Sequence, residues 1–300
     1  MNKVLSICLV IILFTSCGSE PQNKYLTYQN IIILSDMSDR LNPKINGSIT
    51  NQQYPSNDLN EIYKIINYFK SDCVKPGEKI GDKSCISFSA FSEKVAATID
   101  INQIKKLGDK QCFINSTGKY SSCGLEQKIK EFKTTVSHVY DSIRNPGLDL
   151  ISLLIEKISN EPIVKNDTYL TDGIDTTFLH YDNHIYIFTD GYLEYRNKVV
   201  NSQFYFSYSE IKKVRQYCIA NNLDLLKALE SNKSLCLPAY NNKNNKYINL
   251  HILETHERDK NLDNQTYKHP TGQRDNEILE AVWRKWAKDS GFKNLTWDKY

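Results

Sequence analysis

Several features that identify common enzyme and binding classes are missing from this sequence. None of its eight cysteines forms a Cys-x-x-Cys pair, which argues against a zinc site built on neighbouring thiolates. No Gly-x-Ser-x-Gly, His-Glu-x-x-His or phosphate-loop motif occurs, so no motif indicates a serine hydrolase, a zinc protease or a P-loop nucleotide-binding protein. The formal net charge is only +3, which gives no argument for a nucleic-acid partner.

Long hydrophobic runs are also missing beyond the N-terminal region, so no later segment predicts a membrane span. The single apolar run, residues 4–14, follows Lys3 and is too short to cross a membrane, as in the core of a secretory signal. Small residues then precede Cys17 in the sequence Phe-Thr-Ser-Cys. This arrangement resembles a bacterial lipoprotein signal, which implies removal of residues 1–16 and a diacylglycerol on the Cys17 sulfur. The other interpretation is a plain signal peptide with a cysteine there by chance.

The lipoprotein resemblance implies a protein anchored by lipid in the bacterial cell envelope, on the periplasmic or cell-surface side. Six cysteines remain beyond the signal and Cys17, and an even number in an exported chain favours disulfides. The sequence alone allows every pairing among them. We expect the sequential set, because each bond then closes a short loop. The predicted pairs are Cys73 with Cys85, Cys112 with Cys123, and Cys218 with Cys236.

Alternating strand and helix patterns predict an α/β fold with a doubly wound, mostly parallel sheet and helices on both faces. One antiparallel hairpin, residues 84–99, is expected at the edge of the sheet. We predict a tether at 17–29, a single domain at 30–292 and a C-terminal tail at 293–300. The expected strands are 30–34, 84–91, 95–99, 184–189 and 247–253, and the expected helices are 58–70, 125–143, 149–158, 208–221, 223–231 and 276–289.

Dense polar residues follow two of these buried strands. The run Asp36-Met37-Ser38-Asp39-Arg40 comes directly after residues 30–34, and Thr189-Asp190-Gly191 ends the strand at 184–189. Ligands of open α/β sheets bind outside the carboxyl ends of the strands. We therefore expect Asp36, Ser38 and Asp190 to meet at one site. Asp39 is expected to bond with nearby backbone amides of its own loop.

The three loops together resemble those of a von Willebrand factor A (vWA) domain. Asp-Met-Ser-Asp-Arg after a buried strand, Pro-Gly-Leu-Asp-Leu at a helix start, and Phe-Thr-Asp-Gly after a later strand follow the family's order. The resemblance covers roughly residues 28–292 and implies a metal-ion-dependent adhesion site. Asp36 and Ser38 match the first loop and Asp190 matches the third, and the ion would be Mg²⁺ or Mn²⁺, which prefer oxygen ligands.

Two positions depart from the family pattern. Arg40 stands where the family has a second serine, and Leu148 stands where it has a threonine. One interpretation is that Arg40 pairs with Asp36 or Asp190 and takes the place of the ion, because a buried charge needs a partner. The other is that Asp149 supplies the missing oxygen while Arg40 points outward. The sequence leaves both open.

Two further groups lie near the predicted site. Tyr192, Tyr195, Tyr205 and Tyr208 follow the third loop, and either form a recognition surface or pack an extended insert. His256 follows the strand at 247–253 and would lie at the same edge, unless this is only a solvated strand exit.

Three functional classes fit these observations. The first, which we favour, is a binding or adhesion module that presents the sheet edge to a protein or glycan partner, and it is not an enzyme. The second is a metal-dependent phosphoester hydrolase built on Asp36, Asp190 and His256. The third is a metal-free scaffold of the envelope. Loss of partner binding in Asp36→Ala with the fold intact would separate the first from the third.

Overall fold

The computed structural model describes most of the chain beyond the N-terminal region. Residues 1–22, and with them the expected signal and Cys17, lie outside the described part. No helix among the described residues is long and apolar enough to cross a membrane. The described ranges are 23–41, 54–75, 81–142, 147–160, 163–195, 203–254, 257–261 and 264–300.

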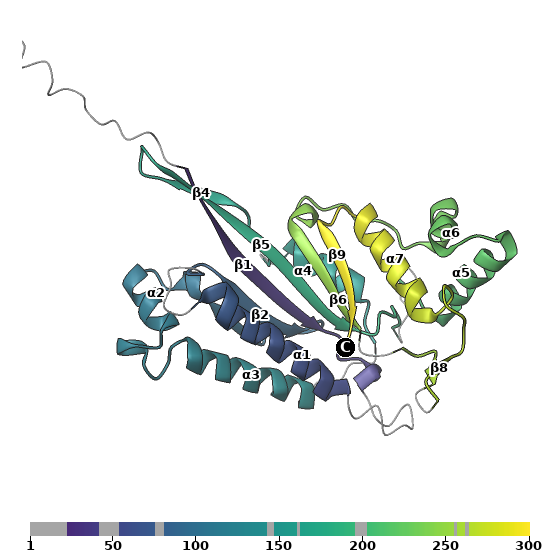
Figure 1. Cartoon of the computed structure of the whole chain (residues 1–300), viewed down its shortest axis with the longest axis horizontal. Coiled ribbons are helices and arrows are strands. Elements are labelled where there is room, and N and C mark those ends of the chain that lie inside the picture. The colour runs from purple at the N-terminus through teal and green to yellow at the C-terminus, as the bar shows by residue number, and fades with distance from the viewer. Residues whose placement is uncertain are drawn as a thin grey trace, which may run out of the picture. The chain divides into compact units, whose positions relative to one another are not determined.

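Strands and helices alternate along the chain (Figure 1). The helices are α1 (Tyr54–Tyr68), α2 (Leu107–Ile114), α3 (Leu125–Ser142), α4 (Leu150–Asn160), α5 (Tyr208–Asn221), α6 (Leu225–Ser231) and α7 (Asp275–Asp289). The strands are β1 (Asn23–Ser35), β2 (Cys85–Ala90), β3 (Ala97–Asp100), β4 (Thr168–Thr171), β5 (Thr176–Thr189), β6 (Ile248–Glu254), β7 (Lys260–Asn261), β8 (Thr266–Tyr267) and β9 (Asn294–Lys299).

The chain divides into two compact units, which are described separately. The ribbon unit comprises the chain up to Thr27 together with Asp167–His180, and its described residues are 23–27 and 167–180. The main unit comprises Tyr28–Asn166 and Tyr181–Tyr300 and holds all of the helices listed above.

The sheet of the main unit has the order β3-β2-β1-β5-β6-β9. β1 pairs with β2, β5 with β6, and β6 with β9 in parallel, whereas β2 and β3 form an antiparallel hairpin at one edge. The order runs outward in opposite directions from β1 and β5, which makes their junction the switch point of a doubly wound sheet. The predicted α/β fold, with its mostly parallel sheet and one antiparallel edge, is therefore confirmed.

Helices cover the two faces of this sheet (Figure 1), and a hydrophobic core lies between the helices and the sheet on each face. Successive residues of β1 point to opposite faces: Ile31 and Ile33 contact the core under α1 and α3, and Ile32 and Leu34 contact the core under α4, α5 and α7. A strand buried on both faces reads as a continuous apolar run, which explains the Ile-Ile-Ile-Leu sequence. The helices thus fix β1 from both sides and position the loop that follows it.

The structure corrects the expected chain ends. Residues 294–299, expected within a tail, form the edge strand β9. Leu295 and Trp297 alternate with polar residues and are buried in the core under α4, α5 and α7. Residues 23–29, expected within a tether, already belong to β1. The segments α2 and β4 were also not predicted.

The six cysteines expected in disulfides are free thiols in the structure. Cys73 and Cys85 are buried, and the Cys85 thiol donates to Asn30 Oδ1 at 2.7 Å. The Cys236 thiol donates to the Leu229 carbonyl at 3.2 Å. Each of these two thiols is thus engaged by a polar neighbour, and none of the three predicted pairs is formed.

Candidate functional site

The carboxyl ends of β1 and β5 meet at the switch point and carry the two predicted acids. Ser35 ends β1 and is followed by Asp36, and Thr189 ends β5 and is followed by Asp190. The Asp36 backbone N–H donates to the Phe188 carbonyl at 2.9 Å, which joins the two strand ends directly. This junction is where open α/β sheets place their ligands.

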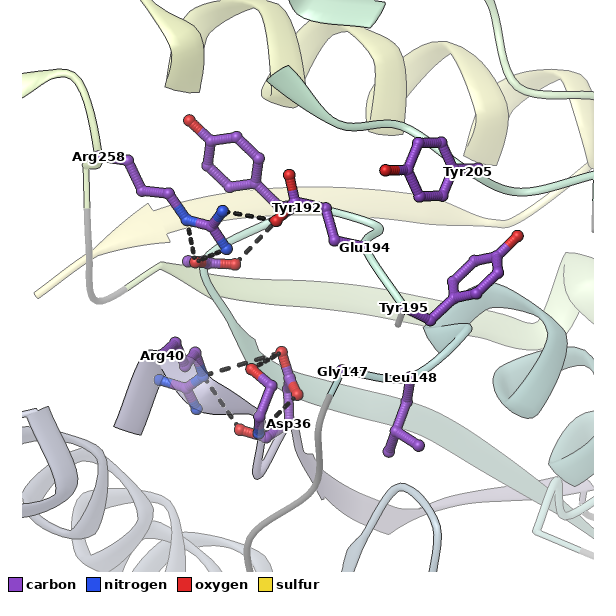
Figure 2. A pocket seen from close by; sticks show the side chains of 11 residues that line it. Asp36, Arg40, Gly147, Leu148, Tyr192, Glu194, Tyr195, Tyr205 and Arg258 are labelled. Atoms are coloured by element: carbon purple, nitrogen blue, oxygen red, sulfur yellow. Dashed lines mark hydrogen bonds and ion pairs between the residues drawn. The ribbon is translucent and has the colours of Figure 1, made fainter. Parts of the chain in front are cut away.

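A pocket of about 300 Å³ opens at this junction (Figure 2). Three of the four predicted ligand residues, Asp36, Ser38 and Asp190, line it, whereas Asp149 does not belong to its lining. The complete lining is Asp36, Ser38, Arg40, Gly147, Leu148, Asp190, Tyr192, Glu194, Tyr195, Tyr205 and Arg258.

The Asp36 carboxylate is buried and held by its own loop. Oδ1 accepts from the Ser38 backbone N–H at 3.0 Å, and Oδ2 accepts from the Ser38 hydroxyl at 3.1 Å and the Thr189 hydroxyl at 3.3 Å. Burial raises the pKa of Asp36 to about 6; Arg40 opposes this rise and the nearby Asp190 carboxylate adds to it. Hydrogen bonds therefore fix the Asp36 carboxylate at the floor of the pocket, and its burial makes the negative charge energetically unfavourable.

The acid closest to Arg40 is Asp58, and not Asp36 or Asp190 as the sequence suggested. Its Nη2 lies 2.7 Å from Asp58 Oδ2, whereas its Nε lies 3.9 Å from Asp36 Oδ2 and donates instead to the Asp36 carbonyl at 3.0 Å. The side chain is 1% exposed, so the interpretation in which Arg40 points outward is wrong. Burial disfavours the charge, but Asp58 and Asp36 together hold the pKa of Arg40 above its usual range.

Asp58 was missed as a site residue because the sequence shows it only as part of a helix. It lies in α1, is fully buried, and accepts from two tyrosine hydroxyls: Tyr140 at 2.9 Å and Tyr300 at 2.7 Å. Tyr140 also forms a hydrogen bond with Ser35 at the end of β1. Burial and Asp58 raise the pKa of Tyr140, so its hydroxyl stays a donor. This network fixes Arg40 as part of the pocket floor.

Asp190 is paired with a different arginine, Arg258, which sequence reasoning did not identify. Arg258 Nε and Nη2 lie 2.8 Å and 2.7 Å from Asp190 Oδ2, and its Nη1 lies 2.7 Å from Glu194 Oε2. The guanidinium also lies over the Tyr192 ring, 3.8 Å from its centroid (Figure 2). The Arg258 side chain keeps 36% of its surface exposed, so this cation faces the pocket and solvent.

The loop after Asp190 depends on a glycine. Gly191 has φ +82°, and a Cβ there would lie 2.6 Å from the Trp297 ring. Its carbonyl accepts from Trp283 Nε1 at 2.9 Å. Both tryptophans therefore pack close to the backbone at this point, which explains why Thr-Asp is followed by glycine.

A buried glutamate ends the neighbouring strand β6. Glu254 Oε2 accepts from Trp297 Nε1 at 2.7 Å, whereas Oε1 is buried without a hydrogen-bond partner among the described residues. Burial raises the pKa of Glu254 to about 8, and Asp190 contributes to that rise. The carboxyl is therefore largely protonated near neutral pH and adds little negative charge to this edge.

Asp149, the fourth predicted ligand residue, caps a helix. Its Oδ1 accepts from the Ser152 backbone N–H at 3.0 Å and its Oδ2 from the Ser152 hydroxyl at 2.8 Å, which is the bonding of an N-cap for α4. The neighbouring Leu148 lines the pocket with an apolar side chain. The second loop thus offers the pocket a hydrophobic wall.

Three of the four tyrosines singled out in the sequence line the pocket: Tyr192, Tyr195 and Tyr205. The rings of Tyr195 and Tyr205 pack edge to face, with centroids 5.4 Å apart. Tyr208 lies outside the lining and begins α5. The structure does not describe the side chain of Asp39 or any part of His256.

The donor set does not fit a divalent ion as it is arranged. Arg40 and Leu148 offer no oxygen at the two positions that depart from the family pattern, Asp149 is turned to Ser152, and Arg258 occupies Asp190. Among the described residues, no group of three or more His, Cys, Asp or Glu side chains could hold an ion. Magnesium binds through several oxygens in near-octahedral geometry, which this set does not provide.

The pocket nevertheless has an excess of negative charge. Arg40 is neutralised by Asp58, and Arg258 faces both Asp190 and Glu194, while Asp36 adds a further carboxylate. A cationic group would be attracted to this pocket and an anionic group repelled. In comparisons with known proteins, no family model, no curated protein and no solved structure matches this chain.

Proposed function

We propose that this protein is a lipid-anchored protein of the bacterial cell envelope whose main unit is a vWA-like binding module. The observation that carries the proposal is the meeting of Asp36, Ser38 and Asp190 around one pocket at the sheet's switch point. The family resemblance of the three loops and the doubly wound strand order support the same assignment. The lipid would be attached at Cys17.

The module works without a bound ion in this proposal, because Arg258 supplies a cation on Asp190 where the family has metal. The proposed ligand is a cationic side chain, lysine or arginine, of a partner protein. Acid excess attracts its charge, and Tyr195, Tyr205 and Leu148 provide walls for its aliphatic stem. Tyrosine-rich, partly apolar walls around a few charges are typical of protein interfaces.

A thermal melt with small probes tests the function. Agmatine carries a guanidinium group on an aliphatic chain and mimics the proposed ligand, and acetate is the anionic counterpart. We expect agmatine to raise the unfolding midpoint and acetate to leave it unchanged; at about 100 times its Kd a ligand adds roughly 2.7 kcal/mol to the folded state. Measurements in EDTA and then in millimolar Mg²⁺ or Mn²⁺ should give the same midpoint.

Two variants make the melt specific. Asp36→Asn should abolish the agmatine shift, because it removes the carboxylate at the pocket floor. The matched control is Asp289→Asn, which changes an acid paired with Lys285 at the end of α7 and should keep the shift. A larger shift with acetate than with agmatine would contradict the proposed ligand, and a Mg²⁺ shift that Asp36→Asn removes would contradict the ion-free site.

A further inference from the structure

The ribbon unit carries a concentration of exposed apolar side chains. Twelve large hydrophobic side chains of the described residues are exposed, and half of them lie in this one small unit. They are Tyr25, Leu26, Tyr169, Leu170, Ile174 and Phe178. Exposed apolar residues that form a contiguous patch mark an interaction site, whereas single ones are normal on any surface.

Three of these side chains form an aromatic row across neighbouring strands. Tyr169 of β4 is the cross-strand partner of Phe178 in β5, so both rings stand on the same face. The Tyr25 ring stacks on Phe178, with centroids 5.1 Å apart and an interplanar angle of 13°. The row stays accessible, with Tyr169 64% and Tyr25 74% exposed.

The turn that joins β4 to β5 limits how this unit can approach an apolar phase. The Asp172 carboxylate accepts from the backbone N–H groups of Ile174 at 3.0 Å and Asp175 at 2.8 Å, and these bonds lower the pKa of Asp172. A turn with two aspartates resists burial in hydrocarbon. The aromatic face is therefore better suited than the turn to contact an apolar phase.

We propose that the aromatic row of Tyr25, Tyr169 and Phe178 is a membrane-contact face that lies in the interfacial layer of a phospholipid bilayer. The proposal rests on the proposed lipid at Cys17. Only five residues separate Cys17 from Asn23, the start of β1. At about 3.5 Å per residue, β1 begins within roughly 20 Å of the anchor. Tyrosine is enriched at membrane–water interfaces, where its ring is apolar and its hydroxyl is hydrated.

The charged residues of the ribbon unit indicate which class of lipid headgroup it would contact. The described residues of the ribbon unit contain Lys24 and three aspartates, Asp167, Asp172 and Asp175, so acids outnumber bases. Asp167 is further engaged by His180 Nδ1 at 2.8 Å. Basic clusters, which bind anionic lipid, are thus missing from the described part of this unit. The lipid class that fits is a zwitterionic phospholipid, and salt should not weaken the contact.

Quenching by brominated lipid tests the contact in the full, lipid-modified chain. Tyr169→Trp places a reporter in the row, and the matched control Tyr208→Trp places one at an exposed tyrosine of the main unit. The chain's own three tryptophans give the same background in both variants. In proteoliposomes of brominated phosphatidylcholine, we expect the added signal of Tyr169→Trp to fall by about half and that of Tyr208→Trp to change little.

Other outcomes separate the ribbon from the anchor. Flotation of the chain with the vesicles, together with the mass of the Cys17 peptide, reports the anchor; failure there overturns the lipid assignment. Flotation with equal quenching of both reporters overturns the membrane-contact face alone. Adding Tyr25→Ser and Phe178→Ser to Tyr169→Trp should remove the quenching, and quenching that persists, or that 1 M NaCl abolishes, would also overturn the proposal.

Discussion

Two arginines contact acids at the same edge of the sheet, in opposite surroundings. The Arg40 and Asp58 side chains are 1% and 0% exposed, and tyrosine hydroxyls complete their hydrogen bonds. Arg258 is 36% exposed over a buried Asp190, with Glu194 and the Tyr192 ring as its other partners. Both members of the first pair are closed off from solvent, whereas in the second pair the acid is buried and the arginine reaches solvent.

The difference in solvent exposure predicts different energetic roles for the two arginine–acid pairs. Removing one partner of a buried pair leaves an uncompensated charge and costs about 3–5 kcal/mol, whereas a partly exposed pair contributes about 0–1 kcal/mol. We therefore expect Arg40 to matter mainly for folding, and Arg258 to matter mainly for the proposed ligand site. Four predictions, taken from the largest expected effect to the smallest, test this assignment.

The largest effect is expected at the buried pair. Asp58→Ala leaves the Arg40 guanidinium without its closest acid and two tyrosine hydroxyls without their acceptor. We expect a loss of about 3–5 kcal/mol in the free energy of unfolding, measured by urea denaturation. The double variant Arg40→Met with Asp58→Leu should lose less than the sum of its single variants, because it removes both charges. Additive losses would show that the pair is not coupled.

The contrast between the arginines also shows what the sequence can reveal about the site. Asp36, Ser38 and Asp190 were predicted to meet, because each follows an apolar strand and strand ends of a parallel sheet share one edge. Arg258 lies 68 residues from Asp190 in a segment without strand or helix periodicity. Its partner is set by tertiary packing alone, so no local pattern identifies it. Asp58 was hidden for the same reason, as one polar residue within an amphipathic helix.

The same limit applies to the fold. The helix at α7 was predicted within one residue of its start, since its apolar residues recur at helical spacing over 15 residues. The strand β9 was missed, because its period-two pattern rests on Leu295 and Trp297 alone, in a segment of six residues. A short edge strand becomes recognisable only when the neighbouring β6 is in place to pair with it.

The second prediction concerns the pH dependence of the Asp190 side of the pocket. The folded state holds the pKa of Glu254 at about 8, well above the ordinary value of 4.5, because the carboxyl is buried. The folded state therefore binds this proton more tightly than the unfolded state, and stability falls as pH rises from about 4.5 to 8. We expect the midpoint of the wild type to drop between pH 5 and pH 9.

Glu254→Gln isolates this effect. The amide keeps the size of the side chain and an acceptor for Trp297, but it does not titrate. Its unfolding midpoint should change less than that of the wild type across the same pH range. If the two curves of midpoint against pH are parallel, folding does not raise the pKa of Glu254. The carboxyl would then be solvated in the folded protein.

The third prediction tests whether Arg258 takes the place of an ion. Arg258→Gln should cost less stability than Asp58→Ala, since Arg258 is 36% exposed, although its acid partner Asp190 is only 2% exposed. It frees Asp190 beside Asp36, so millimolar Mg²⁺ or Mn²⁺ should now raise the melting midpoint; at about 100 times its Kd the ion would add roughly 2.7 kcal/mol to the folded state. The control Arg284→Gln removes another exposed arginine, paired with Glu280, and should gain no ion response. An unchanged Arg258→Gln protein would contradict the replacement of the ion.

The smallest effect is expected at Asp149. Its variant tests whether Asp149 serves only as the N-cap of α4 or also as a ligand of the ion. As the N-cap of α4, Asp149 accepts from the Ser152 backbone N–H, and Asp149→Ala should cost about 1 kcal/mol of unfolding free energy. Combined with Arg258→Gln, it should leave the ion response of that variant unchanged, because the carboxylate is turned toward Ser152. Loss of the response would show that Asp149 supplies the oxygen ligand that is missing at position 148. It would also mean that α4 gives up its cap when the ion binds, so that opening the Arg258 side would extend to the second loop of the site.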